Sequence, residues 1–199
     1  MLSSFHQIKW VICSKIGLIF FVNNYNGHGS MLLLPEIMRS DNQQHERSGS
    51  YDCSAIFGDQ FLVLAVVSGL CNIAGRLVGY WLHGKFSFRK LMVTLAAVII
   101  AAYIGISAVE DLLVKEMLMG LLKVAYAIMT NELLIVSYNP RVLGAETLNL
   151  SAGIIQFMCY SGSVMGTSMA VFASNTVALY TCVGLNVVML VVTCTVHEL

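Results

Sequence analysis

Six long apolar runs divide the sequence, and they constrain its fold more than any other feature. They cover residues 10–34, 60–82, 91–109, 112–135, 148–173 and 176–196. Each run is close to the roughly 20 residues that an α-helix needs to cross the hydrocarbon core of a bilayer. None alternates apolar and polar residues over about ten positions, as transmembrane β-strands do. The runs therefore predict an all-α membrane protein, with a single domain over residues 1–199 and about six transmembrane helices.

The composition agrees with this fold class. Hydrophobic residues make up 57% of the 199 residues and charged residues only 11%, against roughly 25% charged residues in ordinary soluble domains. So few charges cannot provide a solvated surface. The 11 Lys and Arg residues balance the 11 Asp and Glu residues, so there is no basic excess for a nucleic acid. We therefore expect the lipid bilayer to surround the protein, and we expect no nucleic-acid partner.

Signatures of enzymes and metal sites are missing from the sequence. It contains no HExxH, P-loop or GxSxG motif, and its six cysteines form no CxxC pair. His28, His83 and His197 lie far apart along the chain, and we expect each of them near a membrane interface. These observations predict that the protein is not an enzyme and holds no metal ion and no cofactor.

The distribution of charge predicts an orientation, because basic residues mark the cytoplasmic loops of membrane proteins. The link between the second and third runs contains Lys85, Arg89 and Lys90 and no acidic residue, and Arg141 lies between the fourth and fifth runs. With six spans, both termini then lie in the cytoplasm and the acidic connection over residues 35–59 lies outside. The sequence predicts a multi-pass protein of the plasma membrane or of an intracellular vesicle.

Polar side chains inside a bilayer are costly, and each is a candidate for function. Asn23, Asn24 and Asn26 interrupt the first run among glycines, and two interpretations remain open. The helix can be broken here, as in helices that line transporter cavities. Alternatively the span ends near Asn23, and residues 31–34 form an interfacial turn.

Three further polar residues lie inside the later runs. Lys123 stands midway along the fourth run, where a lysine facing lipid costs about 2.5–3.5 kcal/mol on insertion scales. We therefore expect it to face a cavity or a counter-charge. Gln156 and Tyr160 are one helical turn apart on the fifth run and can line the same cavity. Together with the three asparagines, these residues are the polar candidates for function inside the spans.

Two further patterns concern the packing of the helices. Arg76 and Glu132 lie near the predicted inner face and are candidates for an ion pair, either as a gate or as a structural strut. Snorkelling of these long side chains is the alternative. Two ladders of small residues, at positions 75 and 79 and at positions 162, 166 and 170, favour close approach of helices.

Three stretches of the sequence resemble one known family. Residues 24–38 (NYNGHGSMLLLPEIM) resemble a seventh helix with a tyrosine–glycine break and a leucine-proline-glutamate exit. Residues 74–90 resemble the basic loop between helices eight and nine, and residues 138–144 (YNPRVLG) resemble the loop after helix ten. Over essentially its whole length, the chain resembles the C-terminal six-helix half of a major facilitator superfamily transporter. The nearest branch is that of synaptic vesicle glycoprotein 2 and the organic ion transporters.

The sequence also departs from the family's pattern. Gly84 stands where the basic loop normally carries an aspartate, and Ser87 and Phe88 replace its glycine and arginine. Val136 replaces a glutamate, and Leu143 replaces a basic residue. A complete family member has two six-helix halves with the solute between them, and this sequence covers one. It is therefore a fragment of a longer product, a half that pairs with a second half or a second copy, or a remnant.

The resemblance implies secondary transport of a small solute. The residues that would line the solute path are Asn23, Asn24, Asn26, Lys123, Gln156 and Tyr160. Lys123 then favours an anionic solute or acts as a fixed counter-charge, and the basic loop residues contact the inner leaflet. The departures favour an alternative, in which the chain is a non-transporting remnant that binds a partner in the membrane. The exposed faces of the first, second, fourth and fifth spans discriminate between the two. A polar face favours a transporter half, and a dry face of small residues favours a packing module.

Overall fold

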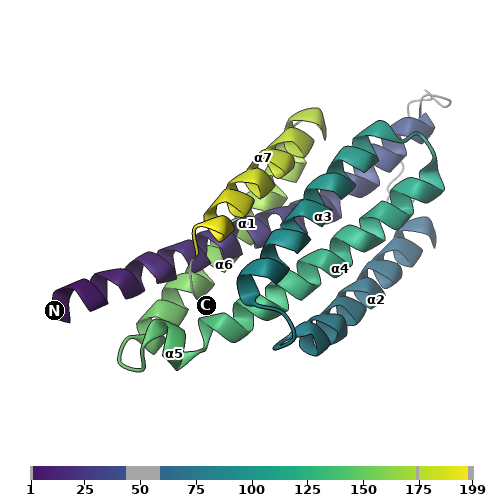
Figure 1. Ribbon diagram of the computed structural model, residues 1–199. Helices are drawn as coiled ribbons and strands as arrows, with labels where there is room; N and C mark the ends of the chain where they lie inside the picture. Colours follow the sequence, from purple (N-terminus) through teal and green to yellow (C-terminus); the bar gives the residue numbers. More distant parts are fainter. Residues whose placement is uncertain (1, 44–58, 174, 197–199) are drawn as a thin grey trace.

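The computed structural model describes residues 2–43, 59–173 and 175–196, and every regular element in these ranges is a helix. The burial of side chains is described for residues 9–30, 66–111, 113–173 and 176–196. The predicted all-α fold class is confirmed. Six long helices and one single-turn helix, α5, follow one another along this part of the chain (Figure 1): α1 Leu2–Gln43, α2 Asp59–Leu82, α3 Phe88–Ala108, α4 Leu112–Ser137, α5 Pro140–Leu143, α6 Leu148–Phe172 and α7 Asn175–Cys194.

Each of the six apolar runs folds into one of the long helices, but the helices differ in hydropathy. By length and composition, three stretches in the described residues could cross a membrane: Phe88–Ala108, Leu113–Ser137 and Thr176–Cys194. Helix α2 contributes a shorter apolar stretch, Val66–Leu82. Helices α1 and α6 contain several Asn, Gln, Ser and Thr residues, which lower their mean hydropathy. The expected count of six spans is therefore not established by helix length and composition.

Helix α1 differs from both interpretations of its sequence. It is continuous from Leu2 to Gln43, so it neither breaks at residues 23–29 nor ends near Asn23. The amide of Asn23 does not compete for the helix backbone, because its Nδ2 donates a hydrogen bond to Thr130 Oγ1 of α4 at 2.8 Å. The helix also passes the position of Pro35, so the connection between the first two apolar runs begins later than expected.

The helices form two layers. Helices α2, α4, α1 and α6 lie in a row in this order, because α4 packs on both α2 and α1, and α1 packs in turn on α6. Helix α3 covers α4 and helix α7 covers α1, and α3 and α7 contact each other. Figure 1 shows the long helices running beside one another along the bundle.

The helix–helix contacts show an internal symmetry between the first three long helices and the last three. If α1 is matched to α4, α2 to α6 and α3 to α7, the contact of α1 with α6 corresponds to that of α4 with α2. The contact of α1 with α7 likewise corresponds to that of α4 with α3. The contacts of α1 with α4 and of α3 with α7 map onto themselves. The bundle thus consists of two three-helix units that interleave, since the main partner of α1 belongs to the other unit.

The core lies between the two layers. It consists mainly of large apolar side chains, and side chains in protein interiors are close-packed. The residues that are buried almost completely include Ile16, Ile19 and Phe20 of α1, Met92 and Ile99 of α3, Leu122 and Met129 of α4, and Met189 of α7.

Glycines set the closest approach between neighbouring helices of the row. Gly162 and Gly166 of α6 lie directly against the carbonyl groups of Phe21 and Tyr25 of α1, and a Cβ at either glycine would overlap these oxygens. A Cβ at Gly75 of α2 would come within 2.7 Å of the Val124 carbonyl oxygen of α4. Both small-residue ladders therefore lie in contacts within the chain.

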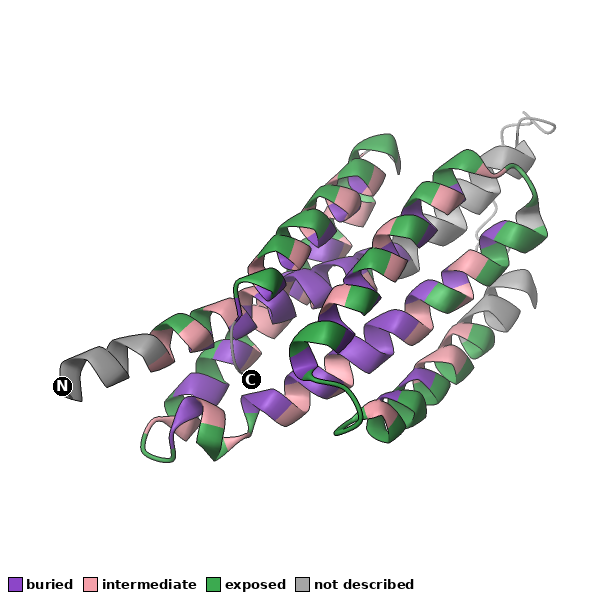
Figure 2. Ribbon diagram, viewed as in Figure 1, coloured by how far each residue is buried: buried purple, intermediate pink, exposed green. Residues whose placement is uncertain are grey.

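Large apolar side chains cover much of the outer surface. Leu77 of α2 is 68% exposed and Phe172 of α6 is 86% exposed. Figure 2 shows exposed residues along much of α2, whose packing in the bundle is mainly against α4. An apolar surface this extensive favours aggregation in water, whereas hydrocarbon would solvate it.

Candidate functional site

Lys123 lies near the middle of the 26-residue helix α4 and bonds to α1. Its Nζ donates hydrogen bonds to the carbonyl oxygen of Gly27 at 3.2 Å and to Ser30 Oγ at 3.4 Å. Both acceptors are neutral, and no carboxylate among the described residues pairs with Lys123. Within this part of the chain the structure therefore supplies a polar anchor for the lysine but no counter-charge.

Two polar stripes with the same spacing face each other across α1 and α4. Their members stand at positions i, i+3 and i+7, which places each set on one face of its helix. The stripes consist of Asn23, Asn26 and Ser30 on α1, and of Lys123, Tyr126 and Thr130 on α4. Two hydrogen bonds join them directly, between Asn23 and Thr130 and between Lys123 and Ser30.

A buried hydrogen-bonded network joins these stripes to the second layer. Tyr126 OH donates to Tyr103 OH of α3 at 3.2 Å. Asn186 Nδ2 of α7 donates to Tyr126 OH at 3.2 Å and to the Cys182 carbonyl oxygen at 2.8 Å. Asn26 Nδ2 donates to that same carbonyl oxygen at 3.5 Å. The network therefore ties four helices together at the centre of the bundle.

Three amide oxygens in this region accept no hydrogen bond from the described residues: Oδ1 of Asn23, of Asn26 and of Asn186. All three side chains are buried. Buried polar atoms usually have a partner in the protein or in ordered water, so these oxygens leave spare acceptor capacity inside the bundle. Groups of three His, Cys, Asp or Glu side chains that could hold a metal ion are not found within the described ranges.

Five residues of the stripes and the network were not predicted from the sequence: Ser30, Tyr103, Tyr126, Thr130 and Asn186. A signal existed for most of them. Tyr126 and Thr130 follow Lys123 at helical spacing, and Asn186 is a polar residue inside an apolar run, the criterion that identified Lys123. Tyr103 gives no such signal, because aromatic residues are common in apolar helices.

The remaining candidates for the solute path lie apart from Lys123. Asn24 Nδ2 donates back to the Phe20 carbonyl oxygen of its own helix at 2.9 Å. Gln156 Nε2 donates to Tyr138 OH at 3.4 Å, where α4 has just ended. Tyr160 is largely exposed. No hydrogen bond joins these candidates to Lys123, so a cavity shared by all of them stays a prediction.

The predicted pair of Arg76 and Glu132 is not formed. The buried carboxylate of Glu132 pairs instead with His83 Nδ1 at 3.1 Å, where the side chains are 4% and 45% exposed, respectively. Arg76 Nε donates to Asn72 Oδ1 of its own helix at 3.3 Å. Seven residues, about 10 Å along a helix, separate Arg76 from His83, and the contacts of the two α2 glycines with α4 set a register that brings His83 level with Glu132.

Exposed basic residues gather at one end of the bundle. Lys85, Arg89, Lys90 and Arg141 are all exposed, and Lys85 Nζ lies 3.3 Å from the ring centroid of Trp81. Figure 1 places the start of α1 and helix α5 at this same end. An interfacial tryptophan with a lysine over its ring is typical of a membrane–water boundary.

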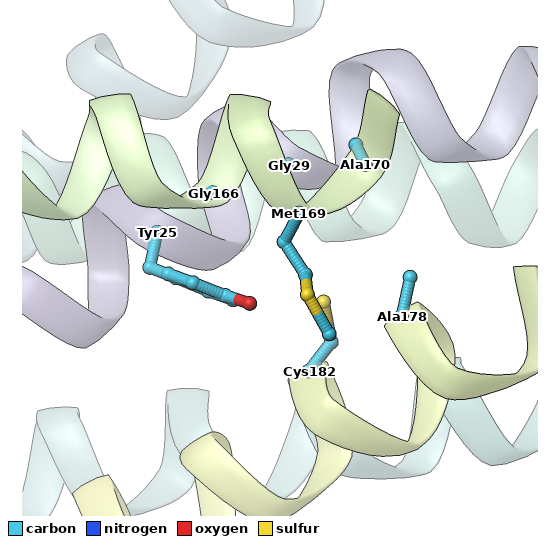
Figure 3. Close-up of a pocket in the computed structure, with 7 residues that line it drawn as sticks. All are labelled: Tyr25, Gly29, Gly166, Met169, Ala170, Ala178 and Cys182. Carbon is cyan, nitrogen blue, oxygen red and sulfur yellow. The ribbon is translucent and has the colours of Figure 1, made fainter. Parts of the chain in front are cut away.

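A small pocket lies between α1, α6 and α7, beside the network. Its volume of about 10 Å³ is enough for roughly one water molecule, and its lining carries no charged side chain. Figure 3 shows the side chains of Tyr25, Met169 and Cys182 around it. The lining comprises Tyr25, Gly29, Gly166, Met169, Ala170, Ala178 and Cys182. Its small size and apolar lining make it unsuitable for a charged solute.

Comparison with protein-family models, curated proteins and solved structures found no match for the chain. The class of protein is therefore defined by fold and site alone. It is a helical bundle with apolar outer surfaces and with a lysine and a polar network at its centre.

Proposed function

We propose that the chain is an integral membrane protein whose six long helices all cross the bilayer, and that it acts in the transport of a small solute. The observation that carries this proposal is Lys123. It is a cation midway along an apolar helix, and its described partners are neutral. Ionisable residues in such positions are rare, and they commonly mark solute or ion pathways.

Polar side chains of α1 point into the bundle, and this supports the proposal that α1 crosses the membrane. Asn23 and Asn26 are buried and donate to α4 and α7, so neither amide needs to face lipid. The exposed apolar residues of α2 and α6 suit the same environment. The basic end of the bundle then lies in the cytoplasm, since cytoplasmic loops are enriched in Lys and Arg.

The correspondence between the helix–helix contacts of the two three-helix units supports the proposal that the chain belongs to a transporter of the major facilitator type. Each six-helix half of such transporters contains two nested three-helix repeats of inverted topology. The resemblance of the loops to this family points in the same direction. A working transporter then needs a second six-helix half, supplied by a longer product or by a second copy of the chain.

The solute that this arrangement favours is anionic. Lys123 has three N–H donors, and the described acceptors are two uncharged oxygens. In an apolar environment an uncompensated charge strongly favours a ligand of opposite sign. A neutral or cationic solute would leave this charge unbalanced.

A second candidate function is that of a non-transporting module that binds a partner in the membrane. The observation that favours it is the apolar stripe on α2, where Leu70, Ile73, Leu77 and Trp81 are exposed. The small-residue ladders do not provide this surface, because they already pack within the chain.

The topology can be tested with single cysteines in a cysteine-free background. We expect an impermeant maleimide to label Thr176→Cys in intact cells, and Glu146→Cys only after permeabilisation. Both side chains are exposed, and α6 lies between them. Labelling of both positions from the same side would show that α6 does not cross the membrane.

The transport function can be tested by uptake and by the size of the native product. A blot of native membranes with an antibody against residues 39–51 should show a band about twice the size of this chain if a second half is fused to it. Proteoliposomes with the native product should accumulate an organic anion. Absence of uptake, with a band at the size of the chain alone, would favour the partner-binding module.

A further inference from the structure

His28 lies beside Lys123 and belongs to the same site. The two acceptors of Lys123 are Gly27 and Ser30, which flank His28 along α1. The His28 side chain is exposed, and it follows directly on Gly27, whose carbonyl oxygen lies 3.2 Å from Lys123 Nζ. The sequence placed this histidine near a membrane interface, whereas the structure places it level with the middle of α4.

The imidazole of His28 and the ammonium group of Lys123 can both donate further hydrogen bonds. His28 donates no hydrogen bond to the described residues, and Lys123 uses two of its three N–H groups. Neither side chain has a carboxylate partner in the described ranges. His28 is exposed and Lys123 is partly exposed, so both side chains have surface that a ligand can contact.

We propose that Lys123 and His28 together bind the carboxylate of a small organic anion carried on an apolar body. This inference rests on the proposed function and names the chemistry of its solute. One lysine supplies a single positive charge, which matches a monoanion. A phosphate dianion is better served by several cations and by the planar fork of arginine. An imidazole N–H can donate to the second carboxylate oxygen whether or not the ring is protonated.

The test measures binding to the purified full chain in detergent by the shift in melting temperature. The probe is sodium benzoate, with tetraethylammonium chloride at equal ionic strength as the cationic control. We expect saturable stabilisation by benzoate and none by the cation. His28→Ala should weaken the apparent affinity for benzoate about tenfold, the equivalent of one charge-assisted hydrogen bond. His28→Gln, which keeps an N–H donor, should restore much of it.

Arg76→Gln is the matched control, because it removes an exposed cation of α2 that bonds to its own helix. It should leave benzoate binding unchanged. Sodium oleate in place of benzoate distinguishes a carboxylate that arrives from the bilayer from one that arrives from solution. Equal benzoate affinity in wild type and His28→Ala, or saturable binding of tetraethylammonium alone, would overturn the inference. Uptake of another solute in proteoliposomes would then leave the proposed function standing.

Discussion

The ammonium group of Lys123 lies 3.2 Å from the carbonyl oxygen of Gly27, so a charged side chain of α4 is bonded to the backbone of α1. A carbonyl dipole solvates a cation but does not neutralise it. The geometry therefore holds the lysine in place and leaves its charge available. This combination distinguishes Lys123 from the buried Glu132, whose partner is the side chain of His83.

Replacing Lys123 by Ala should abolish uptake of an organic anion and leave the fold intact. The α1 helix would keep its other hydrogen bonds to α4 and α7. Lys123→Arg, which retains the charge, should keep part of the uptake. Radiolabelled anion uptake into proteoliposomes measures the effect, and circular dichroism and melting temperature check the fold. Unchanged uptake by a folded Lys123→Ala protein would contradict a role for this residue in the solute path.

Replacing Gly166 by Ala should destabilise the bundle by about 1–3 kcal/mol, the usual cost of overpacking. A Cβ here would overlap the Tyr25 carbonyl oxygen and push α6 away from α1. Gly153→Ala on the same helix is the control, since a Cβ there would meet nothing within 4 Å. Thermal unfolding in detergent measures both. Equal melting temperatures for the two variants would show that this helix contact is looser than described.

His83→Ala should cost about 1–3 kcal/mol, because it leaves the buried Glu132 carboxylate without its partner. Arg76→Ala should cost much less, since Arg76 is exposed and bonds within its own helix. Denaturant unfolding of the two variants compares the costs. If Arg76→Ala were the more damaging change, Glu132 would depend on Arg76 after all, as the sequence had suggested.

Tyr126→Phe removes the hydroxyl group that joins Tyr103 to Asn186. It should lower stability by about 1 kcal/mol for each hydrogen bond lost. A double-mutant cycle with Asn186→Ala should give a coupling energy of at least about 0.5 kcal/mol, because the two residues are in contact. Tyr180→Phe is the control on α7, where the side chain is 71% exposed. Additive effects of Tyr126→Phe and Asn186→Ala would argue that the network does not act as a unit.

Helical periodicity accounts for what could be predicted at the site. Lys123 and the three asparagines stand out as polar residues in apolar runs, and the structure places Asn23, Asn26 and Lys123 in the stripes between α1 and α4. His28 was not predicted to belong to the site, because a histidine among glycines and asparagines is typical of the end of a membrane span. It is the packing of α4 against α1 that puts this residue beside a lysine 95 positions further along the chain.

The sequence by itself determined the class of fold. Apolar runs of helical length, with few charges and only two prolines, leave little choice but helices that pack through apolar faces and glycine contacts. Only the tertiary structure decided which polar groups meet. The polar stretch of α1 stays helical because α4 and α7 provide hydrogen-bond partners from distant parts of the chain. Likewise, two glycines of α2 set the register between α2 and α4, and this register places His83 rather than Arg76 beside Glu132. Arg76 and His83 are about two helical turns apart, which corresponds to about 10 Å along the bundle.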